Sequence, residues 1–232
     1  MEIRNFDDFV SALCHSGFSM GGGNAKGIFS LLSACAEGKE PDHSPIRWHS
    51  EEPETDPWEW RMRVLEERQD IAYSKLFFKT SGYITKEWYP LFLAVRRQGN
   101  SFEDIYESGR ISYTAKRIYD IICREGEIAL HEIKQIGGFK KEDNSAFERA
   151  LVELQMGMFI TMCGRTQKRN KYGMSYGWNS TVFCTVERFW EERNVELSEK
   201  DPQYAYDRIR NQILILNPLA GDKEIDKFIR GK

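Results

Sequence analysis

The sequence predicts a mainly α protein with short β-hairpins, an α+β chain that consists of tandem winged-helix-like units with a C-terminal helical extension. Two observations lead to this prediction. Apolar residues recur three and four positions apart in several segments, which is the spacing of a helix with one buried face. Between residues 111 and 186, three such segments precede two strand-like runs, in the order of a winged helix. We expect a helical, winged-helix-like unit over residues 1–100, a winged-helix domain over 101–186 and an extension over 187–232.

Two amphipathic segments open the chain. The first predicted helix has apolar residues at four helical positions, Phe6, Phe9, Val10 and Leu13. A second helical stripe ends at Gly38 and contains Ile28, Leu31, Leu32 and Cys35. The glycines at 21–23 lack the Lys-Ser/Thr pair of a phosphate-binding loop, so we interpret them as a mobile loop.

The segments from residue 56 to residue 100 start with a well-defined helix N-terminus. Asp56 can act as the N-cap, Pro57 has the preset φ of a first turn, and Glu59 can complete a capping box. The run 71–78 suits either a helix or a strand, and Gly82 is expected to interrupt it. Thr85 is expected to cap the next helix. The winged-helix order therefore recurs in weaker form before residue 100.

The clearest local evidence for a winged helix lies between residues 111 and 186. Strands are predicted over 159–163 and 181–186, joined by a turn rich in Gly, Asn and Ser. Ser112 and Asn144 are predicted to cap the first and third helices of this segment, and glycines end all three helices: Gly126, Gly137, Gly138 and Gly157. In a winged helix, the third helix can enter the major groove and the hairpin can touch the phosphate backbone.

The extension is predicted to contain three helices. A polar helix covers residues 187–194, a second begins at Pro202 and ends at Asn217, and Asp222 is expected to cap the last.

Composition is that of a globular protein with no bulk affinity for nucleic acid. The chain has 232 residues, of which 41% are hydrophobic and 30% charged, with a net charge of −3 and a pI near 5.9. Any contact with nucleic acid must therefore use a local basic patch. No apolar run approaches the roughly 20 residues of a membrane span, so no membrane association is expected.

The five cysteines and four histidines carry no metal motif. The cysteines are widely spaced in apolar runs without a C-x-x-C, so we interpret them as reduced core thiols of a cytoplasmic protein. No histidine has a second His or Cys at a ligand spacing. We therefore expect no metal site and no small-molecule cofactor.

Basic residues concentrate in the predicted turn of the hairpin. Four cations fall within seven residues, and they are Arg165, Lys168, Arg169 and Lys171. They can bind one or two backbone phosphates, or they can simply keep an exposed hairpin tip solvated.

The third helix of the predicted winged helix is less suited to reading DNA. Its polar face offers Ser145 and Arg149, but Glu148 and Glu153 lie on the same helix. Two carboxylates that face phosphate would oppose binding, and a winged helix can also contact protein.

A second candidate site combines an acid, two indoles and two amines, namely Asp56, Trp58, Trp60, Lys75 and Lys79. Such side chains could line a cleft that stacks a base. The favoured interpretation is structural, because a helix cap already explains Asp56 and the two Trp suit a core.

Several blocks resemble one family. They are Trp48-His49, Thr55 to Trp60, Lys75 to Phe78, Gly82 to Thr85, Leu91 to Ala94 and Asn144 to Gln155. In this order they resemble the AlkZ-related proteins, a group similar to the AlkZ/YcaQ winged-helix DNA glycosylases of bacteria. The resemblance covers roughly residues 25–190 and implies tandem winged-helix modules.

The resemblance also implies where catalysis would reside. The glycosylases excise alkylated or crosslinked bases with a Gln-x-Gln or Gln-x-Asp motif just after an early helix. The corresponding segment, 29–35, contains neither Gln nor an acid, so no catalytic residue carries over. We expect a protein that binds duplex DNA, intact or damaged, without the glycosylase chemistry of the family. The alternatives are an interaction module that docks another protein, or a glycosylase with another acid such as Asp56.

Overall fold

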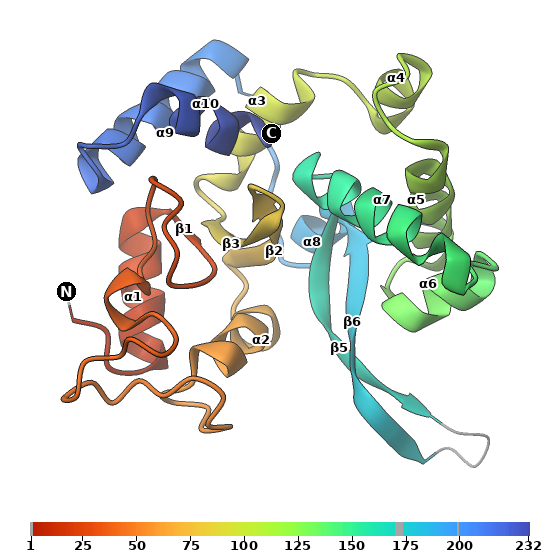
Figure 1. Ribbon diagram of the computed structural model, residues 1–232. Helices are drawn as coiled ribbons and strands as arrows, with labels where there is room; N and C mark the ends of the chain where they lie inside the picture. The colour runs from red at the N-terminus through yellow and green to blue at the C-terminus, as the bar shows by residue number, and fades with distance from the viewer. Residues whose placement is uncertain (1, 170–173, 199) are drawn as a thin grey trace. The chain divides into compact units, whose positions relative to one another are not determined.

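The computed structural model describes residues 2–169, 174–198 and 200–232 (Figure 1). Within these residues the chain forms two compact units. Unit 1 comprises Met1–Gly99 and Leu197–Lys232, and unit 2 comprises Asn100–Glu196. Each contains a three-stranded antiparallel sheet with helices packed around it. The predicted class, mainly α with short β-hairpins, is confirmed. No helix in the described ranges has both the length and the apolar character needed to cross a bilayer.

Unit 1 is organised around the hairpin of its sheet, whose strand order is β1–β3–β2. Helices α3, α9 and α10 pack against one another beside it. Its core contains Trp60 stacked on Phe9 and Phe77 stacked on Phe228. The elements of this unit are α1 (Phe6–Ser16), β1 (Phe18–Met20), a 3-10 turn (Ser33–Cys35), α2 (Pro57–Glu67), β2 (Ile71–Phe77), β3 (Thr80–Thr85), α3 (Tyr89–Arg97), α9 (Pro202–Leu216) and α10 (Asp222–Arg230).

The helix predicted over residues 28–35 is wrong. Only the 3-10 turn forms there, because serine side chains take over the backbone groups. The Ser19 hydroxyl accepts a hydrogen bond from Leu31 N–H at 3.0 Å. The Ser30 hydroxyl donates to the Gly22 carbonyl and accepts from Leu32 N–H. These contacts hold the segment in an irregular conformation.

Two local predictions in the β2–β3 region also need correction. Thr85 does not cap a helix, because it is the last residue of β3 and pairs with Ile71. Helix α3 begins four residues later, with Trp88 at the N-cap. Gly82 lies inside β3 instead of ending a segment. A Cβ at that position would lie 2.3 Å from the Phe77 ring, so the close approach requires glycine.

Unit 2 has the element order that the sequence predicted after residue 111. Its sheet has the order β4–β6–β5, so in both units the first strand lies beside the last. One face of this sheet packs with α5, α6 and α7 in a common core. The elements are α4 (Phe102–Glu107), α5 (Tyr113–Glu125), β4 (Ile128–Ala129), α6 (Leu130–Ile136), a 3-10 turn (Lys141–Asp143), α7 (Asn144–Met156), β5 (Ile160–Arg169), β6 (Ser175–Thr185) and α8 (Val186–Glu191).

The hairpin of unit 2 is longer than predicted. Its strands continue well beyond the expected ends at 163 and 181, so Arg165, Lys168 and Arg169 lie in β5 and not in a turn. The strand continues because the polar residues beyond the core still form ladder pairs, for example Arg165 with Thr181. The start of α7 is also displaced. Asp143 occupies the N-cap position, and Asn144 is already helical because the 3-10 turn leads directly into the helix.

The cysteines are not all core residues. All five are free, but only Cys184 is buried. Cys14 and Cys123 are exposed because they lie on the outer faces of α1 and α5, away from the apolar stripe of each helix.

Candidate nucleic-acid interface

Helix α7 presents the polar side chains that were predicted to face DNA. Its inward face consists of core residues at helical spacing, namely Phe147, Ala150, Leu151 and Leu154. This periodicity leaves Ser145 and Arg149 exposed. The Arg149 guanidinium has neither a hydrogen bond nor an ion pair with any residue that the structure describes. It is therefore available to an anion.

The two carboxylates of α7 are engaged with neighbours. Glu148 forms an ion pair with Lys134 of α6 at 3.2 Å. Glu153 accepts hydrogen bonds from the backbone N–H and the hydroxyl of Ser112, at 3.2 and 2.7 Å. Lys134 offsets the charge of Glu148, whereas Ser112 binds the Glu153 carboxylate and leaves its charge in place. The objection that these acids would repel phosphate is therefore weakened for Glu148.

Two further cations lie next to α7, and the sequence analysis missed them. Lys140 and Lys141 are exposed in and beside the 3-10 turn that leads into the helix. Within the described residues their ammonium groups form no ion pair. Their position just before a helix N-terminus was visible in the sequence and could have added them to the candidate set.

Three of the predicted basic residues, Arg165, Lys168 and Arg169, lie on strand β5 of the hairpin. Along the ladder, Arg165 pairs with Thr181, Lys168 with Tyr176 and Arg169 with Ser175. The side chain of Arg165 is half-buried. Those of Lys168 and Arg169, and all of Lys171, lie outside the described part of the chain. Irregular pairing between Thr166 and Lys168 adds twist near the outer part of the hairpin.

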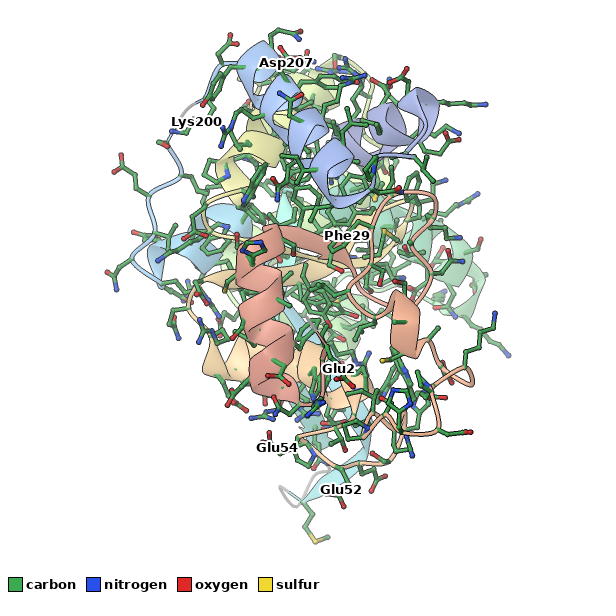
Figure 2. The ribbon with its side chains drawn as sticks, turned by 90° about the vertical axis from the view of Figure 1, so that its left-hand side faces the viewer. Glu2, Phe29, Glu52, Glu54, Lys200 and Asp207 are labelled. Carbon is green, nitrogen blue, oxygen red and sulfur yellow. The ribbon has the colours of Figure 1, made fainter. Side chains whose placement is uncertain are left out.

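Asp56 of unit 1 is a fully buried structural acceptor. Its carboxylate accepts hydrogen bonds from three backbone N–H groups: Trp58 at 2.8 Å, His49 at 3.1 Å and Glu51 at 3.1 Å. It caps α2 as predicted and also holds the preceding loop, where His49 and Glu51 have positive φ. Figure 2 shows Glu52 and Glu54 projecting from the same loop.

The other members of the predicted cleft differ in burial and in their contacts. Trp60 is buried in the core, and its indole N–H donates to the Pro53 carbonyl. Trp58 is 43% exposed and is covered by the Arg61 guanidinium, 3.4 Å from the ring centroid. Lys75 lies half-buried on β2, and Lys79 is exposed in the turn after it.

Comparison with family models identifies the family of this chain. The model of the family described as AlkZ related matches residues 3–230. The chain belongs to the AlkZ-related family. No curated protein matches it in sequence. A solved structure, the DNA glycosylase AlkZ of Streptomyces sahachiroi, matches 75% of this chain with 10% identity and a TM-score of 0.39. The chain covers half of that glycosylase.

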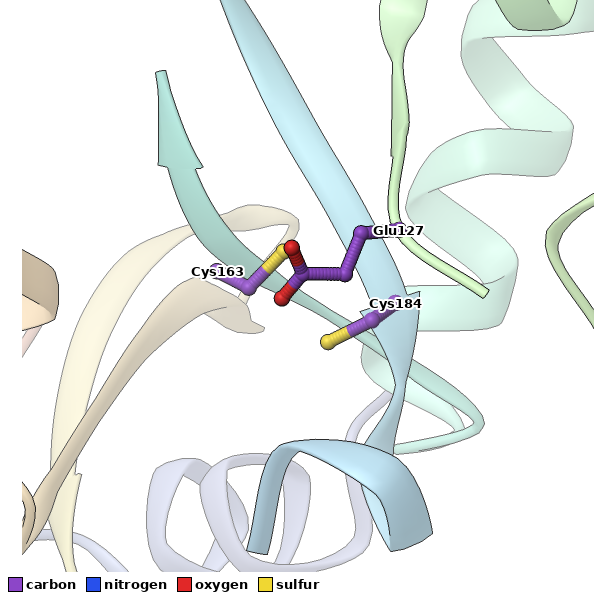
Figure 3. A group of neighbouring side chains, drawn as sticks. All are labelled: Glu127, Cys163 and Cys184. Atoms are coloured by element: carbon purple, nitrogen blue, oxygen red, sulfur yellow. The ribbon is translucent and has the colours of Figure 1, made fainter. Parts of the chain in front are cut away.

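Among the described residues of this AlkZ-related protein, one group of side chains has the donor atoms to hold a metal ion. The ligand atoms of Glu127, Cys163 and Cys184 all lie within 4.8 Å of one another. Figure 3 shows the Glu127 carboxylate turned toward the two thiols. The sequence analysis missed this group because its members are far apart in the chain. The expected hairpin could have suggested it, since Cys163 and Cys184 fall on its two strands.

Glu127 also lines a pocket of about 350 Å³ in unit 2, together with Glu125, Ile128, Glu132, Gln135 and Ile136. The carboxylates of Glu125, Glu127 and Glu132 make this pocket unsuited to phosphate.

Proposed function

We propose that this AlkZ-related protein binds duplex DNA through unit 2 and does not excise bases. The proposal rests on the polar side chains of helix α7 and on which of them are engaged by neighbours. Ser145 and Arg149 are exposed and have no partner among the described residues, while Glu148 and Glu153 are held by Lys134 and Ser112. In the order α5–β4–α6–α7–β5–β6, α7 has the place of the helix that enters the major groove of DNA.

The basic residues around α7 supply the phosphate contacts of the proposal. Lys140 and Lys141 precede the helix, and strand β5 after it bears Arg165, Lys168 and Arg169. Lys171 follows two residues later in the sequence. Phosphate contacts fix the position of a protein on the duplex without reading its sequence. A protein with an acidic pI of about 5.9 needs such a local set, because its net charge offers no general attraction.

The proposal that bases are not excised rests on the chemistry of two candidate catalytic positions. The segment 29–35 supplies neither Gln nor an acid. Asp56, the alternative acid, is fully buried and has its carboxylate directed at three backbone N–H groups. A general base must reach the group from which it takes a proton, so this environment supports a structural role.

The test is binding of the purified protein to labelled duplex DNA over a salt series, with an alkylated duplex alongside. The wild type should bind with micromolar or better affinity, and binding should weaken steeply as salt rises. The double variant Lys168→Ala/Arg169→Ala should reduce the salt slope by about two if both residues contact phosphate. Lys223→Ala/Lys227→Ala is the matched control, because it removes the same charge from exposed positions on α10.

The outcomes separate the alternatives. Equal loss of affinity in both double variants would mean that only net charge matters, which contradicts a site on unit 2. No binding at low salt would reject DNA as the partner and favour an interaction module. Strand scission after alkali treatment of the alkylated duplex would reject the absence of catalysis.

A further inference from the structure

The sheet of unit 2 brings three potential metal ligands to one place, each from a different part of the ladder. Cys163 lies on β5 and Cys184 on β6. Glu127 directly precedes β4, and because Ile128 pairs with Phe183, continuing the antiparallel register places Glu127 across from Cys184. The three residues therefore meet where all three strands are adjacent.

These residues lie on the face of the sheet opposite the main core of unit 2. The neighbours of Glu127 and Cys184, Ile128 and Phe183, belong to that core, and Met162, next to Cys163, packs against it. Side chains alternate between the two faces along a strand. Cys163 is the extra residue of a β-bulge between Met162 and Gly164, where the pairing shifts by one residue. The following residue, Gly164, has no side chain to crowd the position.

The donor set matches a borderline-soft divalent cation. Zn²⁺ takes thiolate sulfur at about 2.3 Å and carboxylate oxygen at about 2.0–2.2 Å, usually with four ligands in a tetrahedron. Ligand atoms within 4.8 Å of one another approach that arrangement through small side-chain rotations. Harder cations such as Mg²⁺ and Ca²⁺ prefer oxygen ligands throughout, so two sulfurs exclude them as the preferred occupant.

The charges of the group also balance around a dication. Arg193 lies close enough to interact electrostatically with both thiols and with Glu127. Two thiolates and one carboxylate carry three negative charges, which a dication and the Arg193 guanidinium neutralise. Binding releases both thiol protons to solvent. A partly buried cluster that becomes neutral avoids the large cost of isolated charges.

We infer that Glu127, Cys163 and Cys184 form a Zn²⁺ site that ties β4, β5 and β6 together at the base of the hairpin. The exposed carboxylate of Glu127 leaves the fourth coordination position to water. Of the five cysteines, this pair alone is brought together with a carboxylate in the described part of the chain. The site lies apart from α7, so its occupancy can be measured without reference to DNA.

The test is titration of the full chain, stripped of metal and kept reduced with a phosphine, first with Co²⁺ and then with competing Zn²⁺. A single Co²⁺ per chain should produce thiolate-to-metal charge-transfer absorption, which Zn²⁺ then removes. Cys163→Ser should abolish most of this absorption. Glu127→Gln should keep the absorption but weaken Zn²⁺ binding by roughly tenfold or more.

Controls keep the test independent of folding. Cys123→Ser changes an exposed thiol on α5 and should leave the titration unchanged. Glu127 is exposed and Cys163 half-buried, so neither substitution removes a core residue. Absence of thiolate–cobalt absorption in the wild type would overturn the inference. The inference would also be overturned if Cys163→Ser kept the absorption and the Zn²⁺ affinity of the wild type.

Discussion

Glu153 on helix α7 accepts two hydrogen bonds from Ser112, one from the backbone N–H at 3.2 Å and one from the hydroxyl at 2.7 Å. Ser112 is the N-cap of α5, and its hydroxyl oxygen also accepts from Ala115 N–H. One carboxylate therefore orients the cap of a second helix, 41 residues away in sequence. The relative placement of α5 and α7 depends on this contact as well as on their shared core.

Glu153→Ala should lower the free energy of unfolding by about 1 kcal/mol, because a cap loses its partner and a backbone N–H loses its acceptor. Urea denaturation gives this value. Glu148→Ala, on the same helix, removes only a surface ion pair and should change the stability much less. Equal losses in the two variants would contradict a specific role for the Glu153–Ser112 contact.

Arg149→Ala should weaken DNA binding and reduce the salt slope by about one, because a single phosphate contact is removed. The measurement is the same salt series with labelled duplex. Lys223→Ala on α10 is the control for the change in net charge. A slope that stays at the wild-type value would remove Arg149 from the proposed interface.

Asp56→Ala should cost roughly 2–4 kcal/mol of stability, since three buried or partly buried N–H groups lose their acceptor. Asp56→Asn keeps one carbonyl oxygen and should cost less. Both are measured by urea denaturation, and DNA affinity is measured at a temperature where each variant is folded. A folded Asp56→Asn protein that no longer binds DNA would restore Asp56 to the candidate site.

Stability at acid pH should depend on Glu67. Its hydrogen bond with Arg63 is the main cause that holds the pKa of Glu67 below the ordinary value of 4.5. The folded pKa is the lower one, so the contribution is complete above 4.5 and is lost as the pH falls through the folded value. The stability difference between wild type and Glu67→Gln should therefore shrink in acid.

The effect is small because Glu67 is well exposed, and a series of urea midpoints at different pH values resolves it. Glu87→Gln, at another exposed position, provides the comparison. A wild-type-to-variant difference that grows as the pH falls would contradict the assigned direction.

Local signals predicted much of the fold. N-cap residues, helix-ending glycines and the spacing of apolar residues predicted the helices and strands of unit 2. Each of these signals depends on residues close in sequence, such as Ser112 and Gly126. The segment 28–35 was predicted wrongly, since Ser19 competes for the Leu31 N–H from across the loop. Long-range relationships could not be predicted from local patterns. The Glu153–Ser112 contact and the Glu127–Cys163–Cys184 group depend on helix packing and strand register, which no short window of sequence contains.

The hairpin of unit 2 has a consequence for self-association. Strand β4 pairs with β6 only at Val182 and Phe183, so from Thr181 outward the described part of β5 and β6 is a two-stranded ribbon. The outer edges of such a ribbon carry backbone groups that can pair with a strand of another molecule. Lysine and arginine along an edge oppose this pairing through repulsion between copies. The positive charge that would attract a nucleic-acid backbone would thus also keep two copies of the ribbon apart.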